Sequence, residues 1–219
     1  MLGRLLKYEF KSMSRILIPL FIAAIVLGFL TALFFGGSGF DGESLIYNVS
    51  MFIFMILFVV LVSASVVIAY VMSIQRFRKN LFGSEGYLMN TLPVSANCHI
   101  ASKLIVAVLF QILSVIVAVA AWTAFVSTAS DISFYEIAVG VKTGFSKLYG
   151  FTHGQLPLYM IEMVIVSLIS VSCFNLEIYT AISVGHTLNN HKVLMSFIVF
   201  IAIYVIENYI NTVILYIVP

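Results

Sequence analysis

The stretch that decides the fold is QRFRKNLFGSEGYLMNTLPVSANCHIASK, residues 75–103. It is a polar interval between two long apolar segments. Ser84 can cap a short helix that has Glu85 in its first turn, where a carboxylate favours the positive end of the helix dipole. Pro93 ends that helix, and Ser95 can cap the next one. The interval therefore divides into the end of one helix, a short transverse helix and the start of another.

Composition places this interval in a membrane protein. The chain has 219 residues, of which 62% are hydrophobic and only 9% are charged, whereas a soluble domain carries about 25% charged residues. Its net charge of +2 is too small to indicate a nucleic-acid partner. We therefore expect an integral membrane protein in contact with the lipid bilayer.

The apolar segments predict an all-α, polytopic helical bundle. Each is near or above the roughly 20 residues that cross a bilayer. The second is long enough to project into water and to carry Arg76 and Arg78 on a helical extension. We expect five clear spans, at residues 16–35, 45–73, 104–126, 158–182 and 193–209. An odd count with an apolar end suggests a sixth span that is missing from this sequence.

Two further helices are expected at the membrane surface. Residues 2–15 have leucines on one side and cations on the other, which is typical of an interfacial helix. Glu9 projects from the apolar side, and either reaches water or pairs with Arg76 or Arg78. Residues 127–157 form a second loop, in which a helix over 134–149 follows a capping-box spacing of Ser133 and Glu136.

Positive residues set the orientation. With the N-terminus in the cytoplasm, nine Lys and Arg residues lie inside and two lie in the outer loops. This distribution follows the positive-inside rule and makes residues 75–103 a cytoplasmic loop, with 127–157 outside. The inner cations are Arg4, Lys7, Lys11, Arg15, Arg76, Arg78, Lys79, Lys103 and Lys192; the outer ones are Lys142 and Lys147.

The short helix of the loop carries Tyr87 and Leu88. It has few apolar neighbours of its own in water, so it either enters a socket on another protein or packs against the N-terminal helix.

Three stretches resemble the type-2 ATP-binding-cassette (ABC) permeases of Firmicutes. They are RFRKNLFGSEGYLMNTLPVS at 76–95, LLKYEFK at 5–11 and IYTAISVG at 178–185. The resemblance implies a coupling helix in the 75–103 loop, on which Ser84, Glu85, Tyr87 and Leu88 contact a cytoplasmic ABC ATPase. It also implies a second permease subunit, identical or homologous, and six helices per subunit, of which the sixth is not clear here.

Polar residues inside the spans are candidates for a pathway or gate. A charge in the hydrocarbon core costs about 3 kcal/mol or more, so such residues usually face protein or water. Glu177 is placed to pair with Lys192 or His186, or to line a cavity. Glu207, Asn208 and Asn211 interrupt the last span, where the resemblance implies a re-entrant outer gate.

The sequence predicts no catalytic, cofactor or metal site. Gly83-Ser84-Glu85-Gly86 lacks the Lys-Ser/Thr ending of a phosphate loop, so ATP and Mg²⁺ are expected on the partner ATPase alone. His186 and His191 have no Cys or carboxylate cluster beside them, and Cys98 and Cys173 are expected to be free thiols.

These observations favour a multi-pass permease subunit of an ABC exporter in a bacterial cell membrane. It is not itself an enzyme, and its substrate would be hydrophobic or amphiphilic, such as a peptide, lipid or drug. The alternative is an ATP-independent secondary transporter or channel that uses the intramembrane residues Glu177 and Glu162.

Overall fold

The computed structural model describes residues 2–36, 45–83, 86, 96–129, 134–187 and 192–217. These residues form helices and no strands. Five helices are long and apolar enough to cross a membrane, as expected for a multi-pass membrane protein. They are α1 (Leu2–Gly36), α2 (Leu45–Phe82), α4 (Ala96–Ala129), α6 (Leu156–Thr187) and α7 (Lys192–Ile217), and a further helix is α5 (Phe134–Phe151).

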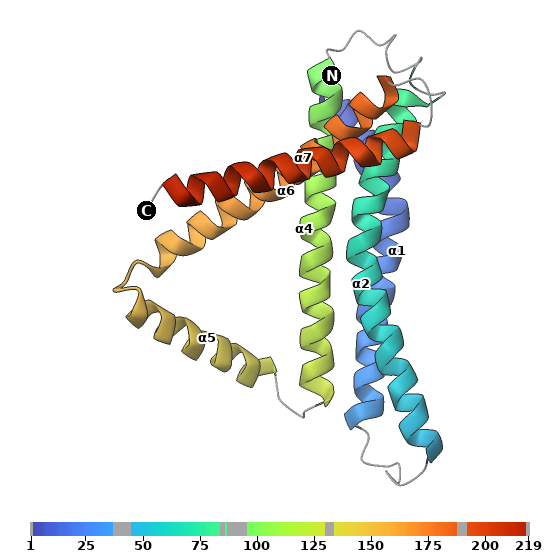
Figure 1. The fold of residues 1–219 in the computed structure, drawn as a ribbon. Coiled ribbons are helices and arrows are strands. Elements are labelled where there is room, and N and C mark those ends of the chain that lie inside the picture. The colour runs from blue at the N-terminus through green and yellow to red at the C-terminus, as the bar shows by residue number, and fades with distance from the viewer. Residues whose placement is uncertain are drawn as a thin grey trace.

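Helices α1, α2 and α4 run side by side as a three-helix bundle (Figure 1). Their shared core is apolar, and Leu17, Phe58 and Phe110 are its largest fully buried hydrophobic side chains. Gly28 of α1 lies so close to α4 and α2 that an added Cβ would stand 3.1 Å from the carbonyl oxygen of Ala121 and 2.8 Å from the ring of Phe58. Small residues at such positions allow helix backbones to approach closely in the absence of water.

Helices α6 and α7 form an antiparallel hairpin that crosses one end of the bundle (Figure 1). Only the C-terminal half of α6 is buried, through residues that recur on one face, including Asn175, Tyr179 and Ile182. Gly185 permits the close approach of α7, since an added Cβ would fall within 2.6 Å of the Ser196 backbone. Helix α5 lies apart from the bundle, between the end of α4 and the start of α6.

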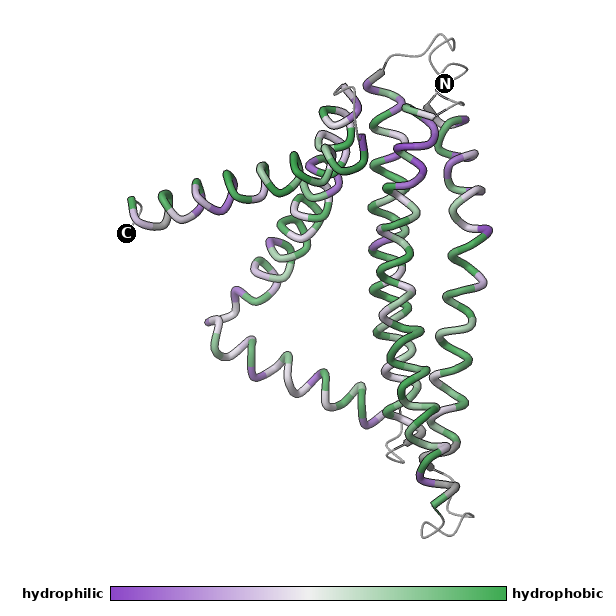
Figure 2. Tube along the Cα trace, turned by 45° about the vertical axis from the view of Figure 1, so that its right-hand side comes forward, coloured by the Kyte–Doolittle hydropathy of each residue, from purple (hydrophilic) through white to green (hydrophobic). Residues whose placement is uncertain are grey.

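Hydrophilic residues of the bundle gather toward the end that holds the N-terminus (Figure 2). Helix α2 continues past residue 73 to Phe82, so the predicted helical extension that carries Arg76 and Arg78 is confirmed. The predicted helix over 134–149 is also confirmed as α5.

The predicted boundary between an N-terminal helix (2–15) and a first span (16–35) is wrong, because α1 is continuous from Leu2 to Gly36. Polarity changes near Arg15, but a change in side-chain polarity does not interrupt the backbone hydrogen bonds. Pro19 lies inside α1 and removes a single backbone donor. At 1.5 Å per residue, 35 residues extend about 52 Å, well beyond a hydrocarbon layer of about 30 Å.

Candidate functional site

A buried ion cluster joins the three bundle helices at their hydrophilic end. Glu9 of α1 accepts a hydrogen bond from Arg76 Nε of α2 at 3.0 Å, and its Oε2 lies 2.6 Å from Arg76 Nη2. Its other oxygen, Oε1, accepts one from Lys103 Nζ of α4 at 2.6 Å. Asn80 Nδ2 donates to the same oxygen at 3.4 Å. One carboxylate therefore links α1 to both α2 and α4.

The cluster is shielded from solvent. The side chains of Glu9 and Lys103 are only 7% and 4% exposed, and that of Arg76 is 19% exposed. Buried charges lose hydration, and their mutual attraction compensates only when the geometry is good and the remaining hydrogen-bonding capacity is used. Here both carboxylate oxygens are occupied by cations. Removing the carboxylate would leave two cations in a poorly hydrated place.

The position of the cluster follows from the sequence around the 75–103 loop. Arg76 and Asn80 are one helical turn apart near the C-terminal end of α2, and Lys103 lies near the N-terminal end of α4. The segment between these helix ends is the loop itself. The cluster thus stands at the base of the loop and ties both of its ends to α1.

A second polar network connects α2, α4 and α6. Asn175 and Gln111 exchange hydrogen bonds between their side-chain amides, at 2.8 and 3.1 Å. Asn175 also bonds Ser73 at 3.4 Å, and Ser73 bonds the Tyr179 hydroxyl at 3.0 Å. All four residues are buried. The network attaches the C-terminal half of α6 to the bundle through polar groups that would be costly to leave unpaired.

The two networks meet at a small cavity. It has a volume of about 10 Å³ and its lining includes Glu9, Ser73, Lys103 and Tyr179. This is about the space that one water molecule needs. The ring of Tyr179 also stacks on Phe77, with centroids 3.9 Å apart. The hydrophilic end of the bundle is therefore closely packed around both networks.

The predicted coupling residues Ser84, Glu85, Tyr87 and Leu88 lie outside the described residues. Their contact with an ATPase stays a prediction.

Two of the predicted pathway residues come together across the α6–α7 hairpin. Glu177 and Glu207 face each other closely enough for their carboxyl side chains to interact. His186, a predicted partner of Glu177, directs Nδ1 to the Ile182 carbonyl oxygen at 2.9 Å.

The predicted interruption of the last span is wrong, because α7 runs unbroken from Lys192 to Ile217. Asn208 donates to the carbonyl oxygen of Tyr204, and Thr212 donates to that of Asn208. The polar side chains thus bond to the backbone of their own helix and do not break it. Asn208 and Asn211 are exposed on α7, so no re-entrant turn occurs at these positions.

Sequence reasoning anticipated the Glu9–Arg76 pair as one of two alternatives, but it missed Lys103, Gln111 and Asn175 as partners. The sequence signal for the amide pair was a single amide side chain in each of two apolar spans, Gln111 in one and Asn175 in the other. Such residues usually face protein or water rather than lipid. The spacing within one helix does not reveal which other helix it meets.

Among the described residues, no three His, Cys, Asp or Glu side chains gather where they could hold a metal ion. No family model matches this chain, and neither a curated protein nor a solved structure matches it.

Proposed function

We propose that this chain is the permease subunit of an ATP-driven exporter for a hydrophobic or amphiphilic substrate. A separate cytoplasmic ABC ATPase would bind ATP and Mg²⁺, and a second permease subunit would complete the pathway. The proposal is supported by five apolar helices among the described residues, by the Lys and Arg residues on the ends of α2 and α4 that flank the loop, and by the resemblance of residues 76–95 to coupling loops.

The observation that carries the proposal is the ion cluster of Glu9, Arg76 and Lys103. A force on the 75–103 loop enters α2 at its C-terminal end and α4 at its N-terminal end. Because Glu9 holds both ends to α1, the three helices respond as one body. Without the ion cluster, the loop would bend before it moved the helices.

The amide network gives this motion a further path. Ser73 lies about one turn from Arg76 on α2, and it bonds both Asn175 and Tyr179 of α6. A displacement of α2 therefore acts on α6, and on α7 through the hairpin. Glu177 and Glu207, which face each other in that hairpin, are the pathway or gate residues in this proposal.

The test combines co-purification with ATP hydrolysis. The tagged chain is purified from its host in mild detergent, and the complex is assayed for ATPase activity and transport. Glu85→Ala with Tyr87→Ala should weaken ATPase association about thirtyfold, the effect of losing an interface hot spot worth ~2 kcal/mol. The matched control is Tyr135→Ala with Glu136→Ala, which removes the same residue types from exposed positions on α5.

Two results would reject the proposal. One is the recovery of a transporting complex that contains no ATPase. The other is an equal loss of association in the Glu85/Tyr87 variant and in the Tyr135/Glu136 control.

A second candidate is an ATP-independent transporter or channel, favoured by the facing carboxyl groups of Glu177 and Glu207. Two carboxylates at close range repel each other, so a cation bound between them is favoured. Transport that persists without an ATPase and vanishes in Glu177→Gln would establish this alternative.

A further inference from the structure

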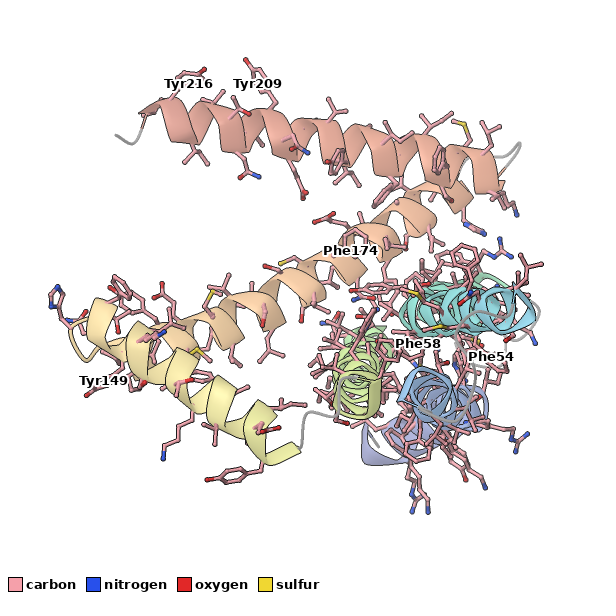
Figure 3. All side chains as sticks on the ribbon, turned by 90° about the horizontal axis from the view of Figure 1, so that it is seen from below. Phe54, Phe58, Tyr149, Phe174, Tyr209 and Tyr216 are labelled. Carbon is pink, nitrogen blue, oxygen red and sulfur yellow. The ribbon has the colours of Figure 1, made fainter. Side chains whose placement is uncertain are left out.

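A large cleft lies between α2 and the α6–α7 hairpin. Its volume is about 690 Å³, which falls within the size range of ligand pockets. The aromatic rings of Tyr70, Phe174 and Phe200 are in edge contact along it, with centroid distances of 5.9 and 6.2 Å. Figure 3 shows Phe174 on α6, beside the bundle. The other walls are mostly aliphatic, and include Val71, Ile74 and Ile178.

One end of this cleft is basic. Gln75, Arg78 and His186 line the cleft and also line an adjoining hollow of about 470 Å³, to which Lys79 and Lys192 contribute. Among the described residues that line either hollow, none is Asp or Glu. An apolar space therefore opens into a cationic one, with Arg78 shared between them.

The dimensions fit an amphiphile. The part of α2 that lines the two hollows runs from Val67 to Phe82, or about 22 Å at 1.5 Å per residue. This length is comparable to that of a lipid acyl chain and its headgroup together. The cleft is formed by helices that are apolar enough to lie in a bilayer, where lipid is the most abundant amphiphile.

We propose that the cleft binds a phosphate-headed anionic lipid. One acyl chain occupies the apolar part against Val71, Phe174 and Phe200, and the phosphate lies at Arg78 and Lys192. A guanidinium can bind phosphate in a bidentate manner, and Lys adds a point charge. Basic pockets between membrane helices recognise lipid headgroups in this way. The exposed side chains of Arg78 and Lys192 are accessible to such a headgroup.

This inference goes beyond the proposed permease function and does not depend on it. Binding is measured on the purified full chain without an ATPase or nucleotide. A failure of lipid binding therefore leaves the coupling proposal untouched, and a failure of coupling leaves the lipid site untouched.

The test compares dipalmitoyl-phosphatidylglycerol with dipalmitoyl-phosphatidylcholine, which has the same chains and no net charge. Affinity is measured by native mass spectrometry and by the lipid-induced rise in melting temperature. We expect the anionic lipid to bind more tightly. Inorganic phosphate and glycerol phosphate, offered at the same concentrations, distinguish a lipid headgroup from a free phosphate, and neither should stabilise the chain.

Two variants separate the contributions of the headgroup and the chain. Arg78→Gln with Lys192→Gln should weaken phosphatidylglycerol binding roughly 25-fold, about fivefold for each cation. Its control, Lys142→Gln with Lys147→Gln, removes two exposed cations of α5 and should leave the affinity unchanged.

Val71→Trp should exclude the acyl chain, whereas Val60→Trp on α2, outside the cleft lining, should not. All variants are first checked for a monodisperse elution profile. Equal affinity for the two lipids, full stabilisation by inorganic phosphate, or unchanged binding in both cleft variants would overturn the proposal.

Discussion

Substitution of Glu9 by Gln tests whether the ion cluster holds the bundle together. Gln keeps the size of the side chain and one acceptor oxygen, but it removes the negative charge. Arg76 and Lys103 then face each other across a neutral amide in a site where the Lys103 side chain is 4% exposed. The remaining two cations repel, and neither can recover full hydration without separating the helices.

The magnitude follows from the burial of the three groups. Removing one partner of a buried ion pair typically costs 3–5 kcal/mol, because the other charge is left without compensation. Gln keeps a hydrogen bond and Arg76 retains some solvent contact at 19% exposure, so we expect about 3 kcal/mol. For a chain of this length, such a loss lowers the melting temperature by roughly 6–12 °C.

The assay is thermal unfolding of the purified chain in a mild detergent, followed by fluorescence-detected size exclusion. Glu162→Gln is the matched control, because this carboxylate is exposed on α6; its change should stay within about 0.5 kcal/mol. Adding Lys103→Met to Glu9→Gln removes one of the two cations that Glu9 contacts and should restore part of the stability. A surface substitution shifts the melting temperature by about 2 °C at most. A shift no larger than this in Glu9→Gln would refute the reasoning.

Two further predictions concern helix α6. Gly185→Ala should force α6 and α7 apart, because the new Cβ would stand within 2.6 Å of the Ser196 backbone; we expect a loss of 1–3 kcal/mol, about the range for overpacking, in the same thermal assay. Gly140→Ala on α5, which meets nothing within 4 Å, should not destabilise, and an equal loss there would remove the argument from close approach. Asn175→Leu should leave the Gln111 amide without its partner and lower stability by about 1–2 kcal/mol. Unchanged stability in Asn175→Leu would mean that the Gln111–Asn175 pair contributes only to the specificity of helix packing.

The features of the fold that depend on local composition could be predicted from the sequence. Apolar length is a property of each segment, so five spanning helices were expected, and the described residues form five helices long and apolar enough to cross a membrane. The extension of α2 to Phe82 followed from a segment too long for one crossing. Helix α5 followed from cap spacing and periodicity around Ser133 and Glu136.

The features that depend on contact between distant residues could not be predicted in the same way. Glu9 and Lys103 are 94 positions apart, and Gln111 and Asn175 are 64 apart. Helical periodicity indicates toward which side of its own helix each side chain points. It does not identify the residue on another helix that the side chain contacts. The sequence also predicted a separate interfacial helix over residues 2–15 and an interruption at Glu207, but the backbone is helical throughout both regions.

Helix α2 carries residues of the ion cluster, the amide network and the cleft. Arg76 and Ser73 connect it to the other helices through the ion cluster and the amide network. One neighbouring face, with Tyr70 and Arg78, lines the cleft. These positions lie within about three turns of each other on a single rigid element.

A lipid that fills the cleft therefore restrains the same segment that the loop would move. If the lipid binds more tightly to one position of α2, lipid binding shifts the helix toward that position. By thermodynamic linkage, the position of the loop then alters the affinity for the lipid by the same factor. The lipid site and the ion cluster are thus expected to be coupled through α2. Glu9→Gln, which loosens the attachment of α2 without touching the cleft lining, should change phosphatidylglycerol affinity although it removes no contact with the lipid. Unchanged affinity would show that the two sites act independently.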